Sequence, residues 1–204
     1  DHRDFLGLVD AVSVVVPTEA HYSVGRAFLN HDVDVLIEKP MTTSLEQADE
    51  LIEIAESRRR ILQIGHLERF NPVVIALKDI VHNPMFSEAH RLSIFKDRST
   101  DVSVVLDLMI HDIDIIMNVV KSEIRSIHAA GVPVICGHAD IANVRLEFES
   151  GCVANVTASR ISIKNQRKIR LFQKDTYVSV GFAGREITII KRDENHPGGL
   201  IPGM

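Results

Sequence analysis

The chain of 204 residues contains no tryptophan, only two cysteines and no apolar run long enough to cross a membrane. We also expect no signal peptide, because the opening residues do not have the pattern of one. Two thiols in a chain of this length favour a reducing cytoplasm over a disulfide-linked scaffold. Long basic runs are missing as well, and the net charge of −5 gives no reason to expect nucleic acid as a partner. We therefore expect a cytoplasmic protein that binds neither membranes nor nucleic acid.

An initiator methionine is also absent. The chain begins Asp1-His2-Arg3-Asp4-Phe5 and leads almost at once into a buried-type strand. This opening is typical of the middle of a domain, so we expect further residues before it. The remaining composition, 45% hydrophobic and 25% charged, is ordinary for a globular protein. The length allows one large domain or two modest ones.

The first third of the chain alternates between strands and helices. Short apolar runs at 10–16, 33–37 and 61–65 predict buried strands, with a helix at 19–30 between the first two. Ser44, followed three residues later by Gln47, predicts the capped start of a second helix. This order predicts a parallel, right-handed, doubly wound sheet.

After Pro72 the pattern changes to an α+β arrangement with a mainly antiparallel sheet. The sequence predicts helices at 73–81 and 102–120 and a loop-like tail at 196–204. Serine and glycine at 150–151, between two alternating runs, predict a hairpin. The strands that we expect lie at 89–95, 141–149, 153–159, 168–172, 176–180 and 186–191. We therefore expect two domains, residues 1–72 and 73–204.

A narrow polar stripe runs along the predicted helix 102–120. At about 100° per residue, one face roughly 80° wide carries Ser103, Asp107, His111, Asp114 and Asn118. The rest of the circumference is apolar, which is typical of a buried helix. We interpret the stripe as facing a cleft, where His111 could act as an acid–base group beside Asp107. A solvated stripe, a buried structural network and a metal site made by Asp107, His111 and Asp114 remain alternatives. No further His or Cys ligand has suitable spacing, so we assign no metal.

A second candidate group follows the strand 33–37, which ends abruptly in Glu38-Lys39-Pro40. In open α/β sheets, ligands bind just beyond the carboxyl ends of the strands. A proline restricts the residue before it to extended conformations. We therefore expect Lys39 to point its ammonium group into a cleft.

These segments resemble the Gfo/Idh/MocA family, the relatives of glucose–fructose oxidoreductase and inositol dehydrogenase. Residues 16–21 are similar to the family's Thr-Pro-Asn-x-x-His turn, and 38–40 to its Glu-Lys-Pro motif. Asp107, His111 and Asp114 match its Asp-x-Gly-x-His-x-x-Asp helix, and 69–72 fits the segment after the last Rossmann strand. The resemblance implies a Rossmann-type domain with its front part missing, followed by a substrate-binding and oligomerisation domain.

The resemblance also implies roles for single residues in an NAD- or NADP-dependent dehydrogenase that oxidises a CH–OH group. Lys39, Asp107 and His111 would be catalytic, with His111 taking the proton from the substrate hydroxyl. Arg69, Asn71, Asp107 and Asp114 would bind substrate. The cofactor side would be lined by Pro17, Thr18, His21, Glu38, Lys39 and Pro40.

Two departures from the family pattern affect these expectations. Met109 replaces a glycine beside His111 and narrows the pocket, and no G-x-G-x-x-G turn is present. The acidic residue that discriminates NAD from NADP would lie in the missing front part, so the sequence does not distinguish the two cofactors. Residues 65–72 and 107–114 further resemble the family's UDP-N-acetylglucosamine 3-dehydrogenase branch, which shares the Met109 departure. A nucleotide sugar, and within that class UDP-N-acetylglucosamine, is therefore the expected small-molecule substrate.

Two alternative functions fit the same fold. One is a non-catalytic module that senses sugar or cofactor, and the other is a reductase of a non-sugar carbonyl or imine. The alternating sheet after residue 124 has two faces, and apolar residues occur on both. Because relatives bury such a sheet between subunits, we expect a homodimer or homotetramer formed through the open sheet.

Overall fold

The structure, a computed structural model, describes residues 1–96, 102–192 and 200–203. The chain divides into two compact units, Asp1–His66 and Leu67–Met204. From the sequence we expect the boundary between the two domains near Pro72, a few residues after this division. The chain joins the second unit earlier because the 3-10 turn Leu67–Phe70 packs against α4 (Ile110–Val120).

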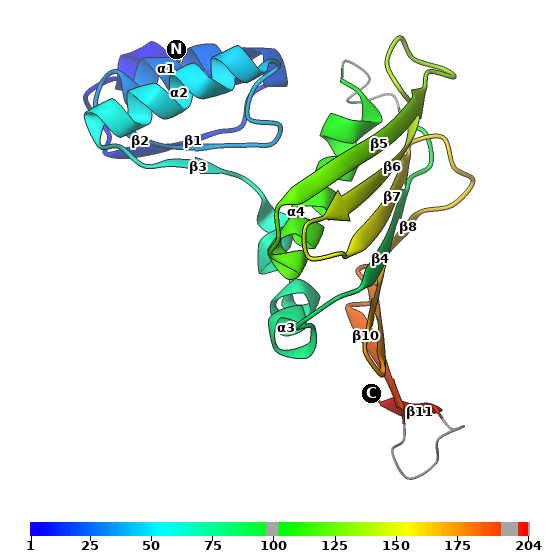
Figure 1. Ribbon diagram of the computed structural model, residues 1–204. Coiled ribbons are helices and arrows are strands. Elements are labelled where there is room, and N and C mark those ends of the chain that lie inside the picture. The colour runs from blue at the N-terminus through cyan, green and yellow to red at the C-terminus, as the bar shows by residue number, and fades with distance from the viewer. Residues whose placement is uncertain (97–101, 193–199, 204) are drawn as a thin grey trace. The chain divides into compact units, whose positions relative to one another are not determined.

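The first unit is a three-stranded parallel sheet with strand order β1-β2-β3. Because the strands advance in one direction, both crossover helices cover the same face, where they pack against each other (Figure 1). A short 3-10 helix, His2–Phe5, precedes the sheet. The elements are β1 (Ala11–Val14), α1 (Thr18–Leu29), β2 (Asp34–Ile37), α2 (Leu45–Arg58) and β3 (Leu62–Ile64).

Burial in this sheet alternates along each strand. Val14, Val35 and Ile37 are buried under the helices, whereas Ser13 and Gln63 are exposed on the other face. The nearly continuous apolar run of β1 therefore has one covered face within the described residues. α1 approaches β2 closely at Gly25, where an added Cβ would lie 2.7 Å from the Ile37 Cδ1.

The predicted cap of α2 is confirmed. The Ser44 hydroxyl accepts a hydrogen bond from the Gln47 backbone N–H, which satisfies one of the unpaired donors at the helix start.

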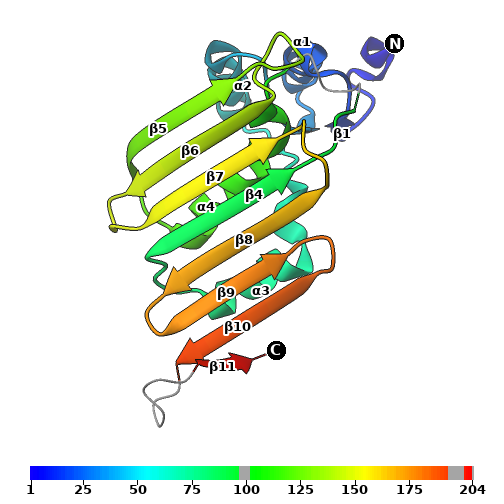
Figure 2. The same ribbon diagram turned by 90° about the vertical axis from the view of Figure 1, so that its right-hand side faces the viewer.

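The second unit contains an eight-stranded sheet with the order β11-β10-β9-β8-β4-β7-β6-β5 (Figure 2). Neighbouring strands are antiparallel except β4 and β7, which are parallel. The hairpin at Ser150-Gly151 is confirmed, and Gly151 adopts a φ of 85°, which favours glycine. The strands are β4 (Phe86–Leu92), β5 (Ile124–Val132), β6 (Ile141–Phe148), β7 (Val153–Ser159), β8 (Gln166–Gln173), β9 (Thr176–Gly181), β10 (Glu186–Arg192) and β11 (Leu200–Gly203).

Two predictions about the ends of this sheet were wrong. The strand expected at 89–95 lies at Phe86–Leu92, because Phe86 and Ser87 already pair with both β7 and β8. The tail expected to be a loop contains β11, which pairs antiparallel with β10, and an edge strand can tolerate the proline at position 202. Residues 193–199 and 204 lie outside the described residues.

Two helices, α3 (Pro72–Ile80) and α4, cover one face of the large sheet (Figure 1). The core beneath them is apolar and includes Leu77, Met109, Ile116, Phe148 and Ile169. The helix predicted over 102–120 was partly wrong. Residues Val105–Met109 form a π-helical turn, and the regular α-helix begins only at Ile110.

Candidate functional site

The turn after β2 is anchored by a buried histidine. The Lys39–Pro40 peptide bond is cis, and the Pro40 carbonyl oxygen lies 2.8 Å from the Nδ1 of His21. The other ring nitrogen of His21, Nε2, lies 2.9 Å from the Val16 carbonyl oxygen. His21 is 2% exposed, so its ring ties the segment after β1 to the turn after β2. We expected His21 to line the cofactor side. These contacts show that its ring also holds the two segments together.

Glu38 and Gly65 lie at the ends of adjacent strands. The Gly65 N–H donates a 2.7 Å hydrogen bond to the Ile37 carbonyl oxygen. A Cβ at position 65 would lie 3.1 Å from the Glu38 carboxylate, tighter than ordinary contact. The carboxylate also accepts a hydrogen bond from the Lys39 backbone N–H. Glycine at position 65 therefore leaves room for the Glu38 carboxylate at the carboxyl end of the sheet.

All six residues that the sequence places on the cofactor side belong to this end of the first unit. Pro17 caps α1 and Thr18 begins it, directly after β1. His21 follows within the first turn of α1. Glu38, Lys39 and Pro40 continue from the last residue of β2. The positions agree with a ligand site beyond the carboxyl ends of parallel strands.

The two acid–base candidates of the second unit lie at a junction between two kinds of helix. Asp107 is within the π-helical turn, and His111 is in the first turn of α4. The turn is π-helical because the Ile110 N–H donates to the Val105 carbonyl, five residues earlier. Asp107 and His111 are both half-buried. π-Helical turns inside α-helices occur frequently at functional sites.

The prediction of one continuous polar stripe along this helix is therefore wrong. Spacing of about 100° per residue applies to an unbroken α-helix, and the π-helical turn changes the phase before Ile110. Ser103 lies before the helix begins, and Asn118 is exposed. Asp114 is buried. The five residues of the stripe thus have different surroundings.

Arg69 and Asp114, both predicted to bind substrate, contact each other. The Nε of Arg69 donates to Asp114 Oδ2 at 2.8 Å, and its Nη2 donates to Oδ1. These hydrogen bonds raise the pKa of the Arg69 guanidinium. Asp114 is 9% exposed, and its backbone oxygen accepts a hydrogen bond from the Asn118 side chain. The pair joins the 3-10 turn at Leu67–Phe70 to α4.

A second, more deeply buried pair joins Arg91 on β4 to Asp112 on α4. Two hydrogen bonds of 2.9 Å connect the guanidinium to the two carboxylate oxygens, and both side chains are 3% exposed. Burial raises the pKa of the Asp112 carboxyl, and the guanidinium opposes that rise. Our sequence reasoning missed this pair. The signal was present, because the alternation of β4 places Arg91 on the same face as Ala89, and a buried charge requires a partner.

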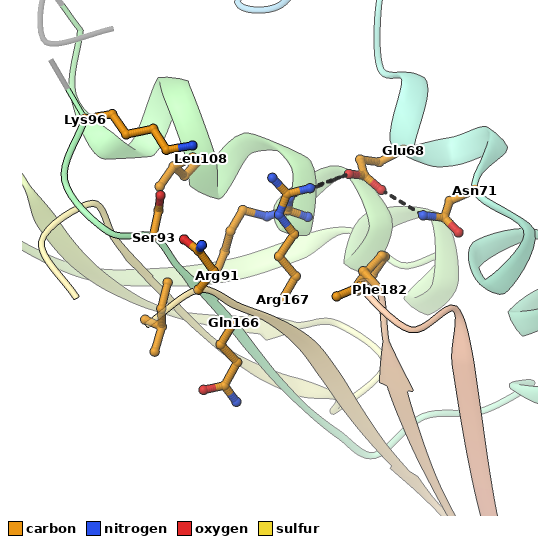
Figure 3. A pocket seen from close by; sticks show the side chains of 12 residues that line it. Glu68, Asn71, Arg91, Ser93, Lys96, Leu108, Gln166, Arg167 and Phe182 are labelled. Carbon is orange, nitrogen blue, oxygen red and sulfur yellow. Dashed lines mark hydrogen bonds and ion pairs between the residues drawn. The ribbon is translucent and has the colours of Figure 1, made fainter. Parts of the chain in front are cut away.

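A cavity of about 300 Å³ lies beside this pair, within the second unit. Its lining includes Glu68, Asn71, Lys96, Leu108 and Arg167 (Figure 3). Glu68 lies 3.7 Å from the guanidinium of Arg91 and also 3.7 Å from that of Arg167. Asn71, expected to bind substrate, is therefore at the cavity. It also caps α3 by accepting from the Val73 N–H. Leu108 belongs to the π-helical turn, so the cavity adjoins the segment that carries Asp107.

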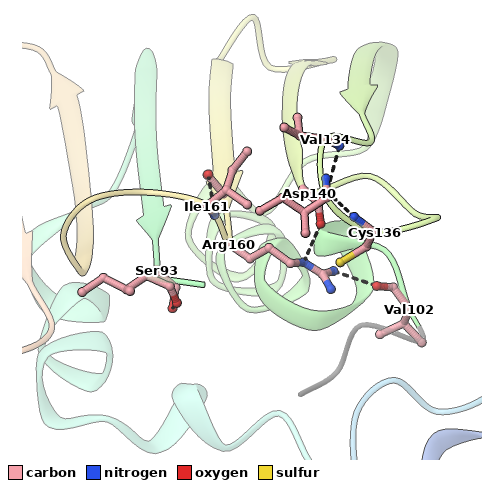
Figure 4. A network of polar contacts seen from close by, with 10 residues as sticks. Ser93, Val102, Val134, Cys136, Asp140, Arg160 and Ile161 are labelled. Atoms are coloured by element: carbon pink, nitrogen blue, oxygen red, sulfur yellow. Dashed lines mark hydrogen bonds and ion pairs between the residues drawn. The ribbon is translucent and has the colours of Figure 1, made fainter. Parts of the chain in front are cut away.

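A polar network holds the segment that leads into the π-helical turn (Figure 4). Oδ2 of the buried Asp140 accepts hydrogen bonds from the backbone N–H groups of Val134, Ile135 and Cys136. Arg160 lies 3.8 Å from the other carboxylate oxygen and donates to the Val102 carbonyl at 2.7 Å. The three N–H donors hold the pKa of Asp140 well below its usual range.

The described ranges contain neither a cluster of metal ligands nor a helix suited to a membrane. Across residues 1–96, 102–192 and 200–203, no three His, Cys, Asp or Glu side chains are grouped so as to hold a metal ion. In the same ranges, no helix combines the length and apolarity needed to cross a membrane. Cys136 and Cys152 are not joined by a disulfide.

Comparison with known proteins assigns both units. Residues 1–66 match the model described as oxidoreductase family, NAD-binding Rossmann fold. Residues 78–178 match the model of the GFO/IDH/MocA C-terminal domain. The two matches divide the chain much as its structure does.

Individual relatives agree with these matches. The chain is 38% identical, over 98% of its length, to UDP-N-acetylglucosamine 3-dehydrogenase of Acidithiobacillus ferrooxidans, and covers 63% of that relative. A crystal form of this enzyme gives a TM-score of 0.91, with 37% identity, over all of this chain and 65% of that one. Myo-inositol 2-dehydrogenase of Thermotoga maritima is 27% identical over 91% of the chain and 60% of its own length.

More distant structures share the fold. An inositol dehydrogenase homologue of Azotobacter vinelandii, complexed with NADH and myo-inositol, gives a TM-score of 0.81 at 18% identity. That match covers 98% of this chain and 62% of the homologue. The chain thus spans somewhat less than two thirds of the relatives named here. From the two matched domains and the relative at 38% identity, the chain belongs to the Gfo/Idh/MocA family of oxidoreductases.

Proposed function

We propose that this protein is an NAD- or NADP-dependent dehydrogenase that acts on a hydroxyl group of a nucleotide sugar. The observation that carries the proposal is the pair Asp107 and His111 at the junction of the π-helical turn and α4, next to a polar cavity. The similarity to UDP-N-acetylglucosamine 3-dehydrogenase supports the 3-hydroxyl of UDP-N-acetylglucosamine as the group oxidised.

The first unit fits one part of a nicotinamide dinucleotide. Glu38 presents a carboxylate over Gly65 that can accept hydrogen bonds from ribose hydroxyls, and Lys39 adds a cation beside it. Because the sequence has no G-x-G-x-x-G turn, we assign no residue of this chain to the cofactor diphosphate. When bound, the nicotinamide supplies an acceptor for the hydride from the substrate carbon.

His111 acts as the general base in this proposal. As the substrate C–H bond gives up its hydride, the hydroxyl loses its proton to the imidazole and a C=O bond forms. Asp107, one turn earlier, holds the imidazole and the substrate hydroxyl in the required orientation. Lys39 contributes a positive charge and assists proton movement. In the reverse reaction, the same histidine returns the proton.

Other residues position this machinery or bind substrate. The pair Arg69–Asp114 fixes α4 to the 3-10 turn, so its contribution to substrate binding is the placement of His111 on that helix. Asn71 lines the cavity and contributes a hydrogen-bonding amide to the substrate site.

We further propose that the protein is a homodimer or homotetramer formed through the open face of the large sheet. That face carries aromatic rings in contact, Phe86 with Phe172 and Phe172 with Tyr177, on adjacent strands. Contiguous aromatic side chains on a sheet face are typical of interfaces. We propose that the reaction takes place in the cytoplasm, because two thiols in a chain of this length favour a reducing compartment.

The test is a spectrophotometric assay of nicotinamide reduction with UDP-N-acetylglucosamine, run with NAD and then with NADP. A ketone-trapping reagent removes the product, so that an unfavourable equilibrium does not hide the oxidation. We expect turnover in the unchanged protein and a loss of at least about a hundredfold in kcat for His111→Ala, the lower range for a general base. His82→Ala is the matched control, because His82 is an exposed histidine between α3 and β4.

The outcomes separate the proposal from its alternatives. Turnover with another sugar alcohol, lost in His111→Ala, would keep the dehydrogenase and reject the 3-hydroxyl of UDP-N-acetylglucosamine. Turnover that is unchanged in His111→Ala would reject the histidine as the base. Binding of cofactor or sugar without turnover across a panel of sugars and carbonyl compounds would favour the sensing module.

A further inference from the structure

The cavity beside Arg91 contains more cationic groups than the proposed hydride transfer requires. Arg91, Lys96 and Arg167 all line it, together with the single carboxylate of Glu68. Figure 3 shows Lys96 and Leu108 on one side and Glu68, Asn71 and Phe182 on the other, with the two guanidinium groups between them. None of the catalytic roles given above uses these three cations.

The three cations differ in how far their charge is already matched. Two nitrogens of the Arg91 guanidinium donate to the Asp112 carboxylate, so the charge of Arg91 is already matched by its partner. Arg167 reaches Glu68 only at 3.7 Å, which is too long for a hydrogen bond, and its side chain is 55% exposed. Lys96 is exposed. Three cations thus face two carboxylates, Glu68 and Asp112, and the two exposed cations retain donors for a ligand.

The remaining lining is suited to an uncharged polar group attached to an anion. Asn71, Asn165 and Gln166 contribute amides, and Leu108 and Phe182 contribute apolar walls. Phe182 is held by the Arg91 guanidinium, whose central carbon lies 5.7 Å from the centre of the ring. Guanidinium groups bind phosphate oxygens by paired hydrogen bonds, and amides read the edges of bases and sugars.

We propose that this cavity is the subsite for the nucleoside diphosphate part of the substrate, with Arg167 and Lys96 as the phosphate-binding residues. The assignment rests on the proposed function, because it divides one nucleotide sugar between the cavity and the segment of Asp107 and His111. Leu108 lines the cavity and follows Asp107 directly, so the diphosphate lies next to the reacting sugar. Arg91, which Asp112 holds in place, lines the subsite and packs against Phe182.

The proposal gives the chain a specificity-determining surface. A free polyol such as inositol has no group that uses Arg167 and Lys96, whereas a sugar linked to a nucleoside diphosphate uses both. Since charge-assisted hydrogen bonds are the strong ones, the diphosphate contributes a large share of substrate affinity.

The test measures binding of UDP by calorimetry, with UMP and uridine as shorter probes, in the absence and presence of saturating NADH. NADH keeps the cofactor site occupied, so that UDP reports on the second unit. We expect affinity to fall in the order UDP, UMP, uridine. Removal of one charge-assisted contact, in Arg167→Gln or Lys96→Gln, should weaken UDP binding about tenfold and leave uridine binding unchanged.

Lys78→Gln is the matched control, since it removes one positive charge from an exposed position on α3. UDP affinity equal in Arg167→Gln, Lys96→Gln and the unchanged protein would overturn the proposal, as would UDP binding that is abolished by NADH. Because both side chains are exposed, the variants should keep the unfolding midpoint of the unchanged protein.

Failure of the subsite and failure of the proposed function give different results. UDP binding that requires Arg167, without turnover of any sugar, would keep the subsite and reject the dehydrogenase. Turnover of UDP-N-acetylglucosamine with the same KM in Arg167→Gln would keep the dehydrogenase and reject the subsite.

Discussion

The two units of the chain use charge in different ways. In the first unit the buried contacts between sheet and helices are made by aliphatic side chains and Phe28, and the buried His21 lies beyond the strand ends. In the second unit charged pairs reach into the contact between helix and sheet, where Arg91 and Asp112 are both 3% exposed. Apolar contacts hold a helix on a sheet at many similar positions, whereas a bidentate ion pair fixes one position. The difference indicates that α4 must be held at a defined place, and α4 is the helix that carries His111.

Arg91→Met should give the largest loss of stability. The substitution leaves the Asp112 carboxylate buried without its guanidinium, which costs about 3–5 kcal/mol. The measurement is the urea midpoint of the unchanged protein and the variant. The double variant Arg91→Met with Asp112→Leu should recover most of the loss, because a buried ion pair can be replaced by apolar groups of similar volume. A loss below about 1 kcal/mol for the single variant would mean that the pair does not distinguish the two units.

Asp140→Asn should change how stability depends on pH. Because the pKa of Asp140 is depressed in the folded state, the folded protein binds fewer protons than the unfolded chain at acid pH. The carboxylate's contribution is present above its unperturbed pKa of 3.8 and is lost as the pH falls toward the folded value. Urea midpoints at pH 3, 4 and 7 should therefore fall more steeply for the unchanged protein than for the variant. Parallel pH profiles of the unchanged protein and the variant would contradict a depressed pKa of Asp140 in the folded state.

Arg69→Gln should lower the free energy of unfolding less than Arg91→Met does, although both substitutions break an ion pair to an aspartate of α4. The Arg69 side chain is 49% exposed, so water screens its charge in the unchanged protein. In the variant, water can hydrate the Asp114 carboxylate that has lost its partner. We expect a loss of about 1 kcal/mol or less. A double-mutant cycle with Asp114→Asn isolates the coupling between the two side chains. A coupling as large as that between Arg91 and Asp112 would show that burial does not set the strength of these pairs.

Gly25→Ala should have the smallest effect. Alanine favours the helix by about 1 kcal/mol over glycine, while its Cβ would press against the end of the Ile37 side chain. Since that end can move, we expect the free energy of unfolding, measured by urea titration, to change by less than about 1 kcal/mol. A loss above about 2 kcal/mol would show that the first unit is packed more rigidly than its aliphatic contacts indicate.

Local sequence signals predicted most of the fold. The capping pair Ser44 and Gln47, the hairpin at Gly151 and the strand before Glu38 each depend on residues close in sequence, and each was found where expected. The family motifs also name Asp107 and His111 as acid–base candidates, and their catalytic roles stay a prediction. What the sequence did not show depends on distant parts of the chain. Arg91 meets Asp112 only because α4 packs on β4, and β11 forms only because β10 offers an edge.

The π-helical turn had no recognisable sequence signal. Its residues, Val105–Met109, fit an α-helix equally well by apolar periodicity, so the stripe was calculated on the wrong geometry. The contacts that surround it, Arg160 to Val102 and Val104 to Ala139, come from the sheet and the loop beside it. Tertiary contacts thus accompany a local conformation that the sequence alone did not indicate.

The position of β4 in the large sheet has a consequence for how the chain folds. β5, β6 and β7 pair as consecutive neighbours, and so do β8, β9 and β10, so each group can form from nearby residues. β4 comes earlier in the chain than either group, yet it pairs with β7 on one side and β8 on the other. Both pairings close long loops, which slows folding. We therefore expect the two meanders to form early and the insertion of β4 between them to limit the folding rate of this unit.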